Sequence, residues 1–108
     1  VAPCAMKTLS AIANSYADSL LVRAADVVLK ERRRLVLMPR ETPLHTGHCE
    51  LLYKASQIGA IIAPPMPAHY INPQSVDDLV DHHVGRILDL FDLDPGLVKR
   101  WQGPSSRQ

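Results

Sequence analysis

The chain has 108 residues, of which 46% are hydrophobic and 21% are charged, and its formal net charge is +1. This composition is typical of one globular domain with a single core, and the near-neutral charge argues against a general nucleic-acid binder. The two cysteines, Cys4 and Cys49, form no disulfide pattern, and the sequence shows neither a signal-peptide pattern nor an apolar run of membrane length, so we expect a soluble, cytoplasmic protein.

The first elements are predicted to be the end of a strand and a short helix. Residues 1–4 are typical of the end of a buried strand and do not begin with methionine, so we expect that an upstream portion is missing. In residues 6–14, helix formers carry apolar side chains at Met6, Leu9 and Ile12. Residues 4–8 then form a strand-to-helix turn whose free backbone N–H groups suit an anion or a flavin edge. An ordinary connection explains this spacing equally well.

A second helix is predicted to begin after Asp18 or Ser19, either of which can cap it, and to end near Glu31. Arg23 and Lys30 lie two helical turns apart and project from the same side. Such a pair could embrace a phosphate, although a solvated helix face is the commoner explanation. The basic run 30–34 suits a helix C-terminus followed by a strand. The residues expected on the buried face are Leu21, Ala24, Ala25 and Val28.

The stretch 35–43 carries the first candidate site residues. Residues 35–38 are predicted to form a short apolar strand, and Arg40 and Glu41 follow in the loop beyond it. Ligands of open α/β sheets bind at the carboxyl ends of strands, so this arginine and glutamate are site candidates from their position alone. The next helix, ended by Gly59, leads to a second apolar strand at 60–63, of the kind found in parallel sheets. The apolar residues expected along that helix are Leu51, Leu52, Ala55 and Ile58.

The longest helix is predicted to begin after Ser75, with Asp78 at the capping-box position. A terminal turn is expected at residues 97–101. We expect a single domain over residues 1–103 and a flexible tail over 104–108. The predicted inner face of the long helix consists of Val76, Leu79, Val80, Val84, Ile87, Leu88 and Phe91.

Short motifs in the chain suggest other functions. The stretch 45–48 matches the H-x-G-H phosphate-binding signature of nucleotidyltransferases, but it lacks their Gly-rich lead after the first strand. The stretch 77–81 matches the D-D-x-x-D of magnesium-dependent isoprenyl synthases, yet acidic residues are favoured at helix starts in any case. His45 and His48 with Cys49 could suggest zinc, but no second cysteine pair completes a site. His82 and His83 project about 100° apart on a helix. We therefore expect no metal.

Several stretches of the chain together resemble one family. They are 3–10 (Pro-Cys-Ala-Met-Lys-Thr-Leu-Ser), 23–33 (Arg-Ala-Ala-Asp-Val-Val-Leu-Lys-Glu-Arg-Arg), 39–45 (Pro-Arg-Glu-Thr-Pro-Leu-His), the proline-rich loop 64–70, Arg86, and 100–103 (Arg-Trp-Gln-Gly). Over nearly its whole length the chain resembles the carboxyl-terminal part of the UbiX-type flavin prenyltransferases, formerly described as 3-octaprenyl-4-hydroxybenzoate carboxy-lyases. The resemblance implies a flavodoxin-like or Rossmann-like three-layer α/β sandwich with a parallel sheet. The family's Gly-Ser-Gly-type loop for the FMN phosphate would lie upstream of Val1.

The same resemblance implies roles for individual residues. The turn Ala5, Met6, Lys7 and Thr8 would contact FMN, as would Arg40, with Ala5 standing where the family usually has serine. Glu41 would assist proton movement at the flavin, and Arg23 and Lys30 would belong to the catalytic set. Lys30, Tyr70 and Arg86 would hold the phosphate of dimethylallyl monophosphate.

The implied reaction joins a dimethylallyl group to N5 and C6 of reduced FMN without a metal. The prenylated FMN would then pass to a UbiD-type decarboxylase. A homo-oligomer is expected, since relatives are commonly dodecamers, and this stretch alone is expected to be inactive. Two alternatives stay open: a direct FMN-dependent decarboxylase of aromatic or cysteinyl substrates, and a non-catalytic fragment that only assembles with other subunits.

Overall fold

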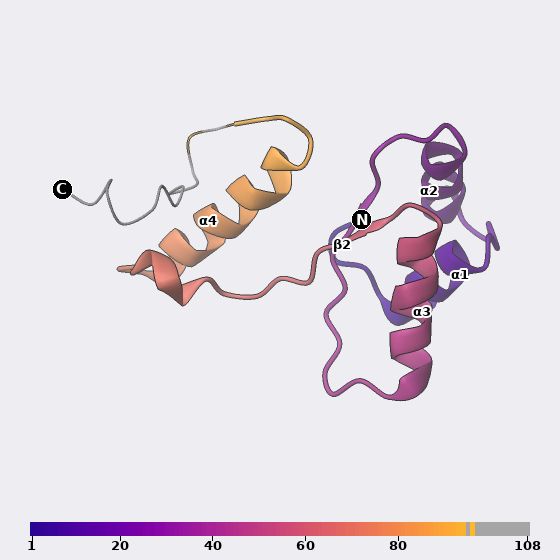
Figure 1. Ribbon diagram of the computed structural model, residues 1–108, viewed down its shortest axis with the longest axis horizontal. Coiled ribbons are helices and arrows are strands. Elements are labelled where there is room, and N and C mark those ends of the chain that lie inside the picture. The colour runs from indigo at the N-terminus through magenta and orange to yellow at the C-terminus, as the bar shows by residue number, and fades with distance from the viewer. Residues whose placement is uncertain (95, 97–108) are drawn as a thin grey trace. The chain divides into compact units, whose positions relative to one another are not determined.

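The computed structural model describes residues 1–94 and residue 96. These residues belong to two compact units, Val1–Pro65 and a second unit that begins at Met66. The first unit contains helices α1 (Met6–Ala13), α2 (Leu20–Lys30) and α3 (Thr46–Gln57) with strands β1 (Val36–Leu37) and β2 (Ile61–Ile62). The second contains a 3-10 turn, η1 (His69–Ile71), and helix α4 (Val76–Asp89) (Figure 1).

The sheet of the first unit is parallel and is centred on β1. Its two strands pair in the register Val36 with Ile61 and Leu37 with Ile62. On the other side of β1, residues 1–4 run in the same direction: the Val1 amino group donates to the Val36 carbonyl at 2.7 Å, and the backbone N–H of Cys4 donates to the Met38 carbonyl at 2.9 Å. The predicted α/β class with a parallel sheet is confirmed, as are the strand end at residues 1–4 and the strands at 35–38 and 60–63.

Helices α1, α2 and α3 pack around this sheet and bury one core. The side chain of Ser19 accepts a hydrogen bond from the backbone N–H of Val22 at 3.2 Å, so Ser19 is the cap of α2. Gly59 ends the α3 segment in the left-handed region at φ = 114°, as predicted. The buried apolar side chains of the described chain are Cys4, Leu9, Ile12, Ala13, Val22, Ala25, Leu35, Val36, Leu37, Ala55 and Ala60.

The predicted buried face of α2 is wrong in part. Ala25 is buried, but Leu21 is 49% exposed, Ala24 is also exposed, and Val22 takes the expected place of Leu21 in the core. Because α2 is apolar on most of its circumference, its sequence period allows two neighbouring stripes, and packing against the rest of the unit selects one of them. In α3, Ile58 is likewise 41% exposed, since the helix has already ended at Gln57.

Helix α4 starts as predicted but faces differently. The Ser75 side chain accepts from the backbone N–H of Asp78 at 3.1 Å, and the Asp78 carboxylate accepts from the backbone N–H of Gln74 at 2.8 Å. The helix buries His82 and Gly85. Four residues of the predicted inner face are instead exposed, so the prediction is wrong for them. The described part of this unit offers only a short turn for α4 to pack against. The four residues are Val76, Val80, Val84 and Phe91.

The predicted turn at 97–101 and the predicted tail at 104–108 lie outside the described residues. Within the described part of the chain, every helix is too short or too polar to cross a membrane.

Candidate functional site

The first candidate site lies at the carboxyl edge of the parallel sheet. Cys4 and Pro39 are bridge partners in neighbouring parallel segments, so Ala5 and Arg40, which follow them, leave the sheet side by side. Helix α1 begins directly after Ala5, and the Ala5 side chain makes no capping hydrogen bond. The first backbone N–H groups of α1 therefore lack a side-chain acceptor at the positive end of the helix dipole, which is an arrangement suited to an anion or a polar ring edge.

Arg40 and Glu41 extend this edge with a cation and an anion. Both side chains are exposed. Neither forms a hydrogen bond or an ion pair with any residue that the structure describes. A guanidinium can donate several hydrogen bonds to a phosphate or a ring carbonyl, and a carboxylate can accept a proton. The structure thus brings together two groups of predicted site residues, Ala5 to Thr8 and Arg40 to Glu41.

The two predicted site cations of α2, Arg23 and Lys30, have different surroundings. Arg23 forms an ion pair with Asp26 at 3.1 Å on the exposed surface of the helix. Lys30 is the last residue of α2 and precedes β1 by a short connection, so it lies toward the amino end of β1, whereas Arg40 follows the carboxyl end of that strand. Within one chain, the structure does not bring Lys30 to Arg40.

Tyr70 and Arg86, the other predicted phosphate ligands, belong to the second unit. The Tyr70 hydroxyl lies 3.3 Å from Nε2 of His82, and their rings meet edge to face with centroids 5.8 Å apart. His82 is only 4% exposed, and this burial lowers the pKa of its imidazole, with smaller contributions from the charges of Arg86 and His83. Arg86 follows His82 by one helical turn on α4, so both side chains project from the same side.

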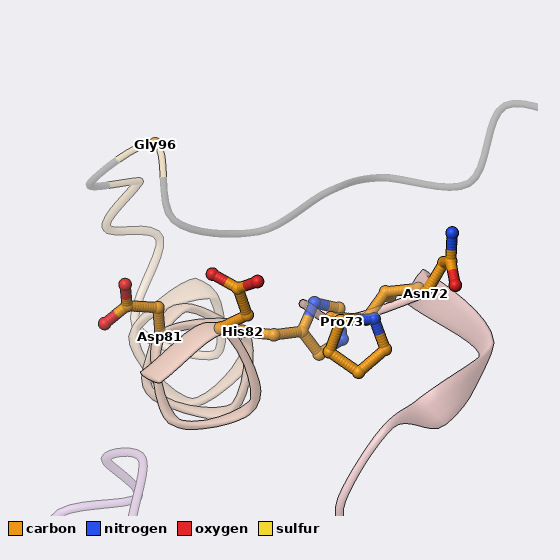
Figure 2. Close-up of a pocket in the computed structure, with 7 residues that line it drawn as sticks. Asn72, Pro73, Asp81, His82 and Gly96 are labelled. Carbon is orange, nitrogen blue, oxygen red and sulfur yellow. The ribbon is translucent and has the colours of Figure 1, made fainter. Parts of the chain in front are cut away.

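Sequence reasoning did not single out His82 as a site residue. The available signal was its position one turn before Arg86 in a helix that follows Tyr70, but only the fold brings the two rings together. His82 also lines a cavity of about 310 Å³ within the second unit, together with Asn72, Pro73 and Asp81. Figure 2 shows the imidazole pointing from α4 toward the proline ring.

The H-x-G-H motif has a structural role at the start of α3. Nδ1 of His45 accepts from the backbone N–H of His48 at 3.2 Å, and Nδ1 of His48 accepts from the backbone N–H of His45 at 3.4 Å. The two rings stack with centroids 3.6 Å apart. This reciprocal cap uses the Nδ1 atoms of both histidines to hold the first turn of α3. Among the described residues, no group of three or more His, Cys, Asp or Glu side chains is placed to hold a metal ion.

A parallel α/β unit with polar side chains and a helix start at the carboxyl edge of its sheet is an architecture shared by many nucleotide- and flavin-binding proteins. Residues 1–88 match the family described as Flavoprotein, and the chain belongs to this family.

Its relatives include named enzymes. The chain is 55% identical over 108 residues to the flavin prenyltransferase UbiX of Thauera aromatica, covering 100% of this chain and 56% of the relative. It is 58% identical over 105 residues to the flavin prenyltransferase UbiX of Escherichia coli strain K12, covering 95% and 56%. The chain thus spans about half the length of the curated relatives it matches.

Two solved structures are also similar to the chain in sequence and in fold. AnUbiX in complex with FMN and dimethylallyl pyrophosphate superposes with a TM-score of 0.90 at 55% identity, over 94% of this chain and 54% of that one. A dodecameric FMN-dependent UbiX-like decarboxylase from Escherichia coli O157:H7 superposes with a TM-score of 0.88 at 55% identity, over 94% and 55%. The predicted resemblance to UbiX-type proteins is therefore confirmed.

Proposed function

We propose that this chain is part of a flavin prenyltransferase that transfers a dimethylallyl group from dimethylallyl monophosphate to N5 and C6 of reduced FMN. The observation that carries the proposal is the carboxyl edge, where the uncapped start of α1 adjoins Arg40 and Glu41. The identity of 55% to 58% with named flavin prenyltransferases supports it. Both units would belong to one flavoprotein domain over residues 1–103, because the family match runs through residue 88.

The residues at this edge fit an FMN ring. Free N–H groups at residues 6–8 and the Arg40 guanidinium are donors for its carbonyl oxygens and ring nitrogens, and the exposed edge leaves room for a planar group. Bound reduced FMN would supply the nucleophilic positions N5 and C6. Glu41, the neighbour of Arg40, would accept or return the proton that the flavin loses or gains during transfer.

The cations would act on the leaving phosphate. As the allylic C–O bond breaks, negative charge grows on the phosphate, and donors already aimed at it stabilise that charge without a metal. We assign this role to Lys30, Tyr70 and Arg86, with Arg23 nearby. Since Lys30 lies toward the other end of β1 from Arg40, it would reach such a site from a second copy of the chain in a homo-oligomer. The dodecameric relative shows that related chains assemble.

We also propose a recipient for the product and a location for the protein. The product would pass to a UbiD-type decarboxylase, which uses prenylated FMN as its cofactor. A cytoplasmic location belongs to the same proposal, since the free thiols of Cys4 and Cys49 suit a reducing compartment.

The test uses the full-length polypeptide that carries this sequence, incubated anaerobically with reduced FMN. Dimethylallyl monophosphate and dimethylallyl diphosphate are supplied separately, because the structure of AnUbiX contains the pyrophosphate. Mass spectrometry of the released flavin should show one added dimethylallyl group, with faster turnover of the monophosphate. Flavin that stays unmodified with both substrates would refute the proposed function.

Glu41→Gln should slow prenylation by about a hundredfold or more, since it removes the proton carrier and keeps the shape of the side chain. Glu50→Gln is the matched control, because Glu50 is an exposed glutamate on α3 to which the proposal gives no role. An unchanged rate in Glu41→Gln would remove Glu41 from the mechanism.

A second candidate is a direct FMN-dependent decarboxylase, the activity by which the similar structure from Escherichia coli O157:H7 is named, although the identity to named flavin prenyltransferases does not favour it. The same incubation separates the two functions when an aromatic acid replaces the dimethylallyl substrate. Carbon dioxide released without any partner enzyme would support the decarboxylase.

A further inference from the structure

The starting observation is a buried histidine without an obvious structural purpose. His82 is the one polar side chain classed as buried among the described residues, and it is 4% exposed. Its Nε2 meets the Tyr70 hydroxyl at 3.3 Å, whereas its Nδ1 is buried and has no hydrogen-bond partner. Nε2 of the neighbouring His83 is likewise buried without a hydrogen-bond partner, so the feature that distinguishes His82 is its contact with Tyr70.

Tyr70 is ordered by this contact with His82. Its side chain is 73% exposed, and its hydroxyl has His82 as its hydrogen-bond partner in the described part of the chain. An exposed tyrosine with no such contact would rotate freely about its side-chain torsions. The edge-to-face ring contact, with an interplanar angle of 88°, and the hydroxyl contact together fix both the ring and its oxygen.

The direction of the hydrogen bond follows from what a phosphate can do. Phosphate oxygens in this setting are acceptors, so a tyrosine that binds one must donate its single hydroxyl proton to it. The Tyr70 oxygen is then free to accept, and the group that faces it is Nε2 of His82. A neutral imidazole with its proton on Nε2 satisfies this requirement.

The surroundings of His82 favour that neutral imidazole. Burial lowers its pKa, and the positive charge of Arg86 lowers it further. Arg86 lies one turn along the same side of α4, so the local positive charge stays on the arginine while the histidine acts as a neutral donor.

We propose that His82 is a positioning residue: its Nε2–H donates to the Tyr70 hydroxyl oxygen and thereby aims the hydroxyl proton at the substrate phosphate. This inference rests on the proposed function and adds a residue to it. His82 does not touch the substrate; it acts through Tyr70, and Tyr70 and Arg86 present two donors to one phosphate.

The test is a double-mutant cycle in the full-length chain. His82→Phe keeps a ring against Tyr70 and removes the donor, and it should raise KM for dimethylallyl monophosphate about three- to tenfold, which is what one hydrogen bond contributes. The dissociation constant for FMN should stay within twofold. His82→Gln, whose amide can donate from nearly the same place, should recover most of the loss. His83→Phe is the matched control, being the same exchange at the neighbouring position, and should leave KM within twofold.

The decisive comparison is made in the Tyr70→Phe background. There His82→Phe should change KM by less than twofold, because the group on which it acts is gone. An equal loss in both backgrounds would overturn the inference and leave His82 as a structural residue. A wild-type chain that does not prenylate flavin would instead overturn the proposed function, and this inference with it.

A second measurement does not depend on the folding of any His82 variant. In ¹⁵N-histidine-labelled wild-type chain, nitrogen chemical shifts distinguish the two neutral tautomers. The proposal requires the proton on Nε2 and a shift of that resonance in Tyr70→Phe. A proton on Nδ1, or an unchanged Nε2 resonance, would overturn it.

Discussion

Replacing Gly47 with alanine should reveal how α3 is held at its start. Gly47 lies in the first turn of α3, between two histidines that cap each other. A Cβ at this position would come within 2.8 Å of Cε1 and 3.1 Å of Nδ1 of His45. The first distance is too short for a real contact, so the His45 ring has to turn away, and its hydrogen bond to the backbone N–H of His48 is lost.

The magnitude follows from two opposing effects. Losing an N-cap hydrogen bond costs about 1 kcal/mol. Alanine is favoured over glycine in a helix by up to about 1 kcal/mol, and by less in the first turn. Gly47→Ala should therefore lower the free energy of unfolding by about 0–1 kcal/mol instead of raising it. His45→Ala alone should cost about 1 kcal/mol.

The assay is urea denaturation followed by far-UV circular dichroism, with both exchanges made singly and together. Once His45 is alanine, its ring no longer obstructs a Cβ at position 47, and Gly47→Ala should then stabilise by up to about 1 kcal/mol. The sign of the Gly47→Ala effect thus reverses between the two backgrounds. If the exchange stabilises equally in both, the ring is not in the way, and the capping account of the H-x-G-H motif fails.

Three other outcomes can be measured on the same chain. Leu37→Ala should lower the free energy of unfolding by about 2–5 kcal/mol, because Leu37 is fully buried. Leu20→Ala is the control at a side chain that is 86% exposed, and urea titration should show a change of less than about 0.5 kcal/mol. Burial raises the pKa of Cys4, so its thiol stays protonated in the folded chain at a pH where it ionises in the unfolded chain, and the free energy of unfolding should fall as pH rises above about 9. Alkylation of the folded chain, read by mass spectrometry, should modify the exposed Cys49 and spare the buried Cys4. The lowered pKa of His82 has the opposite consequence, because the unfolded chain binds the extra proton below about pH 6.5 and the second unit should lose stability on acidification. His82→Gln should weaken this dependence, as urea denaturation at several pH values will show.

Local signals were sufficient for most elements of the first unit. Ser19 marks a helix start, Gly59 marks a helix end, and a run of apolar residues before Arg40 marks a strand, and each of these patterns acts over a few neighbouring residues. The position of Arg40 and Glu41 at a sheet edge followed from the general placement of ligands in α/β folds. These predictions did not depend on tertiary contacts.

The faces of α2 and α4 could not be read from the same signals. In α2, Leu21 and Val22 are both apolar, so periodicity does not decide which of them is buried. In α4, valines at 76, 80 and 84 form a regular stripe, but the residue that the unit buries is His82, whose partner Tyr70 comes from a separate segment. A contact between residues twelve positions apart is set by the path of the chain and leaves no periodic trace in the sequence.

Position 5, the N-cap of α1, holds alanine where serine would be the usual helix cap. A serine hydroxyl there would accept from an N–H group in the first turn of α1 and stabilise the helix by about 1 kcal/mol. With Ala5, the N–H groups at the start of α1 keep no side-chain partner, and the neighbouring Arg40 adds a cation on the same side of the sheet. In the proposed site the flavin would therefore meet backbone donors and one guanidinium, and α1 is stabilised by the burial of Leu9 and Ile12 without a side-chain cap.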